Sequence, residues 1–331
     1  MSVANGRFAL ALLLALAACR EPELCTSKKA QTIIDGTLAT SEAYPAAGAV
    51  LVHAEAHGEV LAELACSAVL IAPDVVLTAA HCIALYQFED EPELPPVDFY
   101  VSFETDVSQF EELALPPPDT AVQVQAFTLH PAFSVNRRAP RESLGELDDI
   151  ALLFLSEPVT TIEPVPFFQA GADLTSWDDV QIVGYGLASV DDPEVGLGVK
   201  RHGSSHLFEV GTNELRVGRA LSADDPVQPG IVDKCYGDSG GPTFVDVGGR
   251  PWLIGVTSRG YRSGPGCGVA GVDTRVDAYE DWIARTADLA CADGRRDPRI
   301  CAHFRIGGQA SGEGSDLAYP IGAVTPCEDG E

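Results

Sequence analysis

The chain has 331 residues, of which 46% are hydrophobic and 21% are charged. This is the composition of a folded globular protein, because disordered chains contain fewer apolar residues. The 49 acidic residues outnumber the 21 basic ones, and the net charge is −28. Since nucleic-acid phosphates are bound mainly by Lys and Arg, the charge argues against a nucleic-acid partner. It suits a soluble exported surface and could steer basic ligands.

The N-terminus has the pattern of a secretion signal. Arg7 precedes an unbroken apolar run from Phe8 to Ala18. This run is too short to cross a bilayer as a helix, but it has the length of the apolar core of a signal peptide. We therefore expect residues 1–18 to be a signal peptide and the protein to be exported.

The cysteine at the end of this run suggests a lipid anchor. Leu-Ala-Ala-Cys at residues 16–19 resembles the lipobox of bacterial lipoproteins, in which the cysteine is lipidated. The alternative is ordinary cleavage after Ala17, because Ala-Leu-Ala at residues 15–17 also satisfies the small-residue rule. The chain has nine cysteines, and lipidation of Cys19 leaves an even set of eight for an oxidising compartment. We expect a lipidated Cys19, with residues 19–32 as a tether or propeptide.

The rest of the chain predicts an all-β fold. From about residue 47, short apolar runs alternate with Gly, Pro and Asp, as in residues 48–54 and 67–80. The residues from Ile83 to Asp148 include an acidic, proline-rich interval that we expect to form surface loops. One amphipathic helix is predicted at residues 276–290. No cysteine or histidine has zinc-ligand spacing, so neither a metal nor another cofactor is expected.

Three short motifs carry chemistry, in the order Leu-Thr-Ala-Ala-His-Cys (77–82), Asp-Asp-Ile-Ala-Leu (148–152) and Gly-Asp-Ser-Gly-Gly-Pro (237–242). A serine hydroxyl is a weak nucleophile unless a base accepts its proton, and a carboxylate can orient that base. The motifs supply one candidate for each role.

Together these motifs resemble those of the trypsin-like (chymotrypsin-fold) serine endopeptidases, and a bacterial secreted or lipoprotein member is the form we expect. The resemblance implies two antiparallel β-barrels with the active site between them. It assigns His81, Asp149 and Ser239 as the catalytic residues, with the backbone N–H groups of Gly237 and Ser239 as the oxyanion hole. Asp149 is preferred over Asp148 because the family's acid directly precedes Ile-Ala-Leu.

The same resemblance covers residues 33–290, which we take as the protease domain. It implies a Cys66–Cys82 disulfide behind the histidine and a Cys235–Cys267 disulfide beside the substrate pocket. Residues 291–331 form a C-terminal extension, expected to be short, irregular and pinned by disulfides. The remaining cysteines, Cys25, Cys291, Cys301 and Cys327, allow three pairings, and the sequence does not choose among them.

The segment Ile-Ile-Asp-Gly-Thr at residues 33–37 resembles the family's mature N-terminus. Cleavage before Ile33 would free an amino group that pairs with Asp238 and orders the oxyanion loop. Thr32 departs from the family's Lys or Arg at the cleavage point. A different protease, or trimming after a cut at Lys29, would then be needed.

Substrate selection is expected to depend on Asp233, six residues before Ser239. In the family this position is the floor of the primary specificity pocket, and an aspartate there selects Arg or Lys. Ser258, Gly260 and Gly271 match the pocket walls. The alternative is that Asp233 pairs internally with Lys234 or with Arg259, which replaces a common aromatic residue.

The sequence therefore predicts an endopeptidase that cleaves proteins or peptides after Arg or Lys through an acyl-enzyme. Its only membrane contact would be a lipid anchor. A catalytically silent, protease-like binding protein and a structural lipoprotein module are the alternatives.

Overall fold

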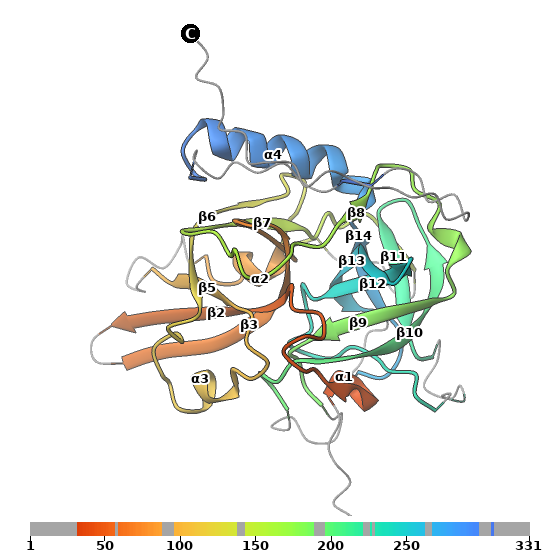
Figure 1. The fold of residues 1–331 in the computed structure, drawn as a ribbon, viewed down its shortest axis with the longest axis horizontal. Coiled ribbons are helices and arrows are strands. Elements are labelled where there is room, and N and C mark those ends of the chain that lie inside the picture. Colours follow the sequence, from red (N-terminus) through yellow and green to blue (C-terminus); the bar gives the residue numbers. More distant parts are fainter. Residues whose placement is uncertain are drawn as a thin grey trace, which may run out of the picture.

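The computed structural model describes residues 32–56, 59–87, 96–137, 143–188, 196–220, 226, 229–261, 267–297 and 306–307. The predicted signal peptide, Cys19, Cys25, Cys301 and Cys327 lie outside these residues. Figure 1 shows two β-barrels side by side, with one longer helix along the top.

The first barrel is closed by six strands. All five of its residues Ala151–Leu155 are apolar and buried, which means that both faces of this strand are covered. Neighbouring strands around the barrel are antiparallel, in the order β2 (Ala47–Ala56), β3 (Glu59–Ala72), β4 (Val75–Thr78), β7 (Ala151–Leu155), β6 (Val122–Leu129) and β5 (Asp98–Ser102). Two short helices, α2 (His81–Ala84) and α3 (Ser108–Glu112), lie in its connections.

The second barrel also closes through six antiparallel strands, in the order β9 (Asp179–Gly184), β10 (Arg201–Val210), β11 (Glu214–Gly218), β14 (Gly271–Arg275), β13 (Arg250–Gly260) and β12 (Pro242–Val247). Three short strands extend it: β1 (Thr37–Leu38) on β10, β8 (Phe167–Phe168) on β13, and β15 (Ile306–Gly307) on β8. The remaining elements are the turn α1 (Thr32–Asp35) and the 3₁₀ turns η1 (Leu174–Ser176) and η2 (Asp277–Tyr279). The two barrels confirm the expected fold class.

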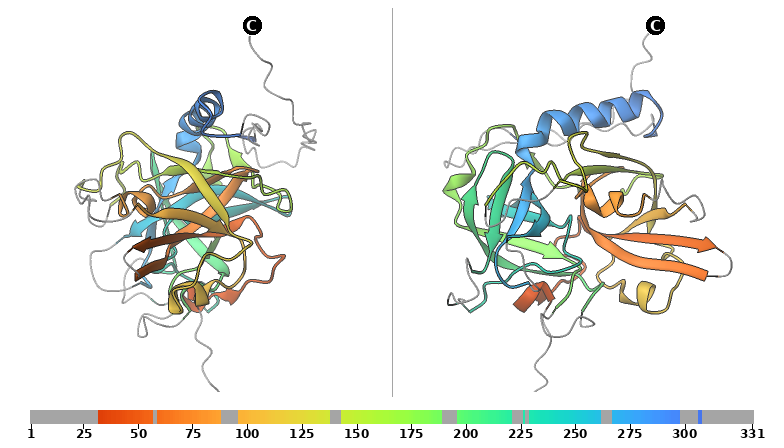
Figure 2. Two further views of the ribbon diagram at one scale, coloured as in Figure 1. Left: turned by 90° about the vertical axis from the view of Figure 1, so that its left-hand side faces the viewer. Right: turned by 180° about the vertical axis from the view of Figure 1, so that it is seen from behind.

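The predicted C-terminal helix is present as α4 (Glu280–Ala292), directly after η2. It buries Ile283, Ala287 and Ala290 in the same hydrophobic cluster as the strands of the first barrel. Beyond its end, Arg296 forms a buried two-bond ion pair with Asp74, with N–O distances of 2.6 and 2.8 Å. The helix therefore follows the second barrel in sequence but is held on the first, along the top of the views in Figures 1 and 2.

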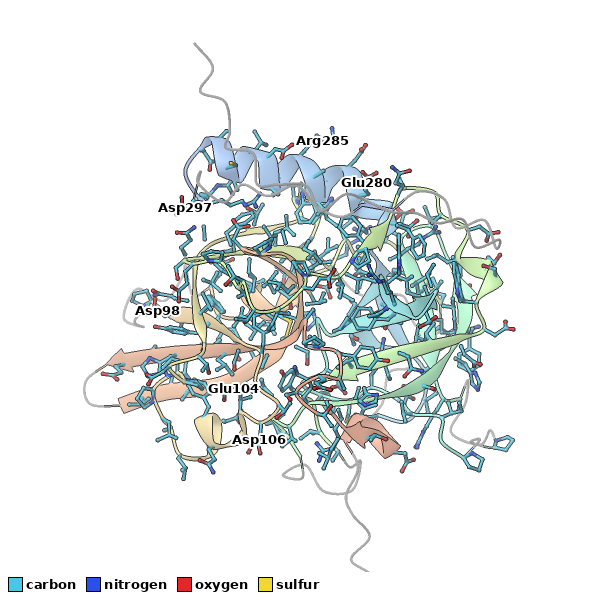
Figure 3. The ribbon with its side chains drawn as sticks, viewed as in Figure 1. Asp98, Glu104, Asp106, Glu280, Arg285 and Asp297 are labelled. Carbon is cyan, nitrogen blue, oxygen red and sulfur yellow. A yellow bond between two sulfur atoms is a disulfide. The ribbon has the colours of Figure 1, made fainter. Side chains whose placement is uncertain are left out.

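Charged side chains cover the outside of the fold. Figure 3 shows Asp98 and Asp106 on the outer side of the first barrel and Arg285 on the outer face of α4, and all three are exposed. Within the described part of the chain, no helix is both long and apolar enough to span a membrane.

Disulfides join Cys66 to Cys82 and Cys235 to Cys267, with Cα–Cα distances of 5.9 and 4.9 Å. The first ties β3 to α2, and the second ties the segment before Ser239 to the residues that lead into β14. Cys291, in α4, is also disulfide-bonded.

Candidate active site

The three motif residues come from both barrels. His81 is the first residue of α2, directly after β4, and Asp149 lies just before β7. Because β4 and β7 pair with each other, the register of the sheet brings these two side chains together. Ser239 lies just before β12 of the second barrel. Its carbonyl accepts the N–H of Ser67 in β3, at 2.8 Å, so the serine segment is hydrogen-bonded to the first barrel.

Asp149 holds His81 through two hydrogen bonds. Its Oδ2 lies 2.7 Å from Nδ1 of the ring, and its Oδ1 accepts the backbone N–H of the histidine at 2.9 Å. The hydroxyls of Ser258 and Thr274 donate to its Oδ2 and its carbonyl, at 2.6 and 2.8 Å. Burial acts to raise the pKa of Asp149, but the bonds from His81 and Ser258 outweigh it and lower the pKa. The carboxylate is thus ionised and holds one ring nitrogen of the histidine in place.

Asp148, the neighbouring acid, has different partners. It accepts a hydrogen bond from the Tyr279 hydroxyl at 2.9 Å and forms an ion pair with Arg137 at 3.2 Å. These contacts occupy both of its oxygens, so Asp149 is the acid next to the histidine.

The serine segment requires its glycines. Gly237 has φ +90°, and a Cβ there would lie 2.8 Å from the Cα of Gly186. Gly240 has φ +74°, and a Cβ there would overlap the hydroxyl of Thr78. Only glycine adopts such backbone conformations at little cost, and only glycine allows Gly240 to approach the first barrel this closely. The turn leaves Ser239 partly exposed between the barrels.

Ser67 is a positioning residue that the sequence reasoning missed. Besides its backbone bond to Ser239, its hydroxyl donates to the carbonyl of Gly237 at 2.9 Å and accepts the N–H of Tyr185 at 3.0 Å. One side chain of the first barrel therefore contacts both the serine segment and Tyr185, directly after strand β9. Its place directly after Cys66 was the only signal in the sequence. Among the described residues, no hydrogen bond involves the Ser239 hydroxyl itself.

Asp238 is buried beneath the serine segment. Its two oxygens accept the N–H groups of Gly186 and Cys235, each at 2.8 Å. Burial raises its pKa to about 6, although these two bonds act in the opposite direction. Ile33 is fully buried in the core of the second barrel, and Ile34 pairs with the backbone of Asp233 at 2.8 and 3.3 Å. The segment expected to follow the activation cut is therefore already packed on this barrel.

Asp233 is buried with one oxygen unpartnered. Its Oδ1 accepts the backbone N–H of Lys234 at 2.8 Å, and among the described residues Oδ2 has no hydrogen-bond partner. Burial raises the pKa of this carboxyl to about 7. The backbone N–H groups and the positive charges of Lys234 and Arg219 act in the opposite direction, although no group among the described residues donates a hydrogen bond to Oδ2.

The internal pairs proposed as alternatives for Asp233 are not formed. The Lys234 ammonium bonds to Asp273 and Thr243 instead. Arg259 forms two bonds to the buried Glu214, at 2.6 and 2.9 Å. Asp233 therefore has no cationic side chain bonded to it within the described part of the chain.

The expected pocket walls lie on adjacent strands. Gly260 at the end of β13 pairs directly with Gly271 at the start of β14. The hydroxyl of Ser258, a residue expected to contact substrate, donates to Asp149. On the other side of Gly237, a groove of about 280 Å³ runs between Tyr236 and Leu64.

One group of described residues brings together metal-binding side chains: Cys66, Cys82 and His81. Both cysteine sulfurs are consumed in the disulfide, and His81 is held by Asp149. A thiolate is the form of cysteine that binds a metal, so these residues do not make a metal site.

Comparisons with known proteins agree with this geometry. The family model Trypsin matches residues 33–283. Tissue-type plasminogen activator from Sus scrofa is 28% identical over 233 residues, which cover 66% of this chain and 38% of that protein. Vitamin K-dependent protein C from Oryctolagus cuniculus is 31% identical over 241 residues, covering 67% and 46%. The chain thus spans less than half the length of these relatives. It belongs to the trypsin family of serine endopeptidases.

Proposed function

We propose that this serine endopeptidase hydrolyses proteins or peptides after Arg or Lys, with Ser239, His81 and Asp149 as its catalytic triad. The observation that carries the specificity is the buried carboxylate oxygen of Asp233, which has no partner among the described residues. The bonds from Asp149 to the His81 ring and backbone support the triad.

The reaction would proceed in two steps. The Ser239 hydroxyl attacks the substrate carbonyl, and Nε2 of His81 accepts its proton and passes it to the leaving amine as the C–N bond breaks. Asp149 stabilises the imidazolium that forms. The N–H groups of Gly237 and Ser239 bind the oxyanion. Water then attacks the acyl-enzyme ester. His81 accepts a proton from this water and returns it to the Ser239 oxygen as the acid product is released.

Specificity would follow from the cost of leaving a buried charge unpaired. A substrate Arg or Lys brings a cation to Asp233, whereas an apolar side chain leaves the carboxylate buried without a partner. A site that requires such a partner discriminates by about 10⁴ against substrates that lack it. We therefore expect Arg and Lys to dominate before the cleaved bond.

Two measurements test this function. Peptides that differ only at the residue before the cut should give a far larger kcat/KM with Arg or Lys than with Phe, Leu or Ala. Equal turnover of the apolar set would contradict the specificity but not the protease assignment. A fluorophosphonate probe should label the protein at Ser239. If chain cut before Ile33 does not react with the probe, the silent binding protein is the correct alternative.

We also propose export with a lipid at Cys19 and activation by cleavage before Ile33. Mass spectrometry should find diacylglycerol on the Cys19 thiol, and an unmodified N-terminus at Ala18 would contradict this.

Chain cut before Ile33 should be active and uncut chain nearly silent, because the new amino group would pair with the buried Asp238. Full activity of chain that begins at Cys19 would contradict the activation step.

A further inference from the structure

Directly behind Asp233, three buried side chains form a closed ring of hydrogen bonds. The ammonium of Lys234 donates to the Asp273 carboxylate and, at 2.9 Å, to the hydroxyl of Thr243. That hydroxyl in turn donates to the other oxygen of Asp273 at 2.5 Å. We call these three residues the lysine ring.

The ring is built into the second barrel. Lys234 and Asp273 have side-chain exposures of 5% and 0%, and Thr243 is fully buried. Gly255 makes room for the acid, because a Cβ at this glycine would lie 3.0 Å from the Cβ of Asp273. The lysine stem passes beside Gly271, one of the expected pocket walls: a Cβ there would lie 3.8 Å from Cδ of Lys234. The ring therefore borders the site in which Asp233 lies.

A charge count shows why the ring matters. With Asp233 ionised, the carboxylates of Asp233 and Asp273 and the ammonium of Lys234 carry a net charge of −1. A substrate cation bound to Asp233 would favour its ionised form and bring these three groups to neutrality. In a protein that lacked Asp273, Lys234 would pair with Asp233. This pair would be neutral before any substrate bound. A bound cation would then leave it with an uncompensated buried charge, which is strongly unfavourable.

Lys234 has a second acceptor available. It follows Asp233 in the chain, and its backbone N–H already bonds to Oδ1 of that carboxylate. Oδ2 of Asp233 is buried and has no hydrogen-bond partner among the described residues. A lysine side chain is a long, flexible stem with a compact charge at its end, so it can be redirected to a neighbouring acceptor. In this structure Asp273 and Thr243 compete successfully for it.

We propose that Asp273, with Thr243, is a specificity-determining positioning residue that holds the Lys234 ammonium away from Asp233 and so keeps the pocket floor negative for a substrate Arg or Lys. This inference rests on the proposed function and deepens it. It predicts that the primary specificity depends on a residue of strand β14 that does not contact the substrate.

The central experiment compares Asp273→Asn with Lys234→Met/Asp273→Asn. In the single variant, Lys234 loses its charged partner and turns to Asp233, so the ratio of kcat/KM for an Arg peptide over a Phe peptide should fall by about 100-fold or more. In the double variant the competing cation is gone, the net charge returns to −1, and the ratio should recover to within about tenfold of the unmodified protein. Asp281→Asn, on the exposed face of α4, removes the same charge and should leave the ratio unchanged.

Recovery of the kcat/KM ratio in the double variant distinguishes this role of Asp273 from a purely structural one. If the ring only supported the fold, the double variant would discriminate no better than the single variant, and the proposal would be wrong. An unchanged ratio in folded Asp273→Asn would also overturn it. If the unmodified protein prefers apolar residues, the proposed function itself fails, which is a different outcome.

Binding of benzamidine, a small aromatic cation, gives a readout independent of turnover. Calorimetry would use Ser239→Ala protein cut before Ile33. Asp273→Asn should weaken binding by at least tenfold, and adding Lys234→Met should restore it. Should Asp273→Asn fail to fold, Thr243→Val removes one of the two acceptors while keeping the side-chain shape. Benzamidine should then bind several-fold more weakly, and unchanged binding would contradict the proposal.

Discussion

The two barrels bury charge to very different extents. Each closes with six antiparallel strands, yet among the described residues the buried charged groups of the first barrel's strands and turns are Asp74 and Asp149. The second barrel buries several, namely Lys200, Arg201, Glu214, Asp233, Lys234, Asp238 and Asp273. The interior of the first barrel is thus mostly apolar, whereas the interior of the second contains several charged groups whose burial is unfavourable unless they are paired. The two residues expected to govern specificity and activation, Asp233 and Asp238, are both buried charged groups of the second barrel.

The largest expected effect removes the nucleophile contributed by the second barrel. Ser239→Ala should lower kcat by about 10⁶, because the triad works as a unit. The fold should be unaffected, since the hydrogen bonds of this segment involve the Ser239 backbone. Peptide hydrolysis and fluorophosphonate labelling measure the loss, and circular dichroism checks the fold. Undiminished labelling would show that another residue is the nucleophile.

Asp233→Asn tests the buried carboxyl of the second barrel that is expected to bind the substrate cation. The kcat/KM ratio of Arg over Phe peptides should fall by up to about 10⁴, because the amide offers no charge to a substrate cation. Hydrolysis of the Phe peptide should persist, since the His81–Asp149 contact is separate. Asp246→Asn, on the exposed part of β12, is the matched control. A variant that keeps its preference for Arg would place the specificity elsewhere.

Arg296→Met tests the buried pair that joins the end of α4 to the first barrel. It leaves Asp74 buried and unpaired, so the free energy of unfolding should fall by about 3–5 kcal/mol. Asp74→Leu/Arg296→Met should recover much of this loss. Arg285→Met removes an exposed pair on the same helix and should cost less than about 1 kcal/mol. Urea unfolding measures the stability of all three variants. Equal losses for Arg296→Met and Arg285→Met would contradict the stabilising role of the Arg296–Asp74 pair.

Two buried carboxyl groups of the second barrel should make the stability of the fold depend on pH. Burial raises the pKa of Asp233 to about 7 and that of Asp238 to about 6, from 3.8. The folded state then binds more protons than the unfolded state between about pH 4 and 7, so these two groups lower the stability as pH rises through that range.

Urea midpoints between pH 4 and 8 would test this dependence. Asp233→Asn should flatten the part of the profile near pH 7, and Asp246→Asn should not. Identical profiles for Asp233→Asn and the unmodified protein would show that the carboxyl is ionised throughout the range.

Several parts of the fold and site follow from local sequence. The alternation of apolar runs and turn residues predicted an all-β fold, and the family resemblance implied the two barrels. The 3.6-residue spacing of Val276, Tyr279, Ile283 and Ala287 predicted the helix. The spacing of Asp233 from Ser239 placed both near one site, because Cys235 and Gly237 leave little freedom between them. The contacts of Ser67 could not be predicted, since a serine inside a buried strand has no local signal for its partners.

The sequence by itself determined the all-β class, because strand periodicity is a local property, and the order of its three motifs carried the resemblance that implied the two barrels of the trypsin family. Only the tertiary structure decided where the buried charges are paired. Lys234 and Asp273 are separated by 39 positions, and Arg296 and Asp74 by 222. Nothing in the chain near Lys234 indicates that its ammonium turns away from the adjacent Asp233. That choice depends on which acceptors two other strands bring within hydrogen-bonding distance in a water-free interior, where an unpaired charge is most unfavourable.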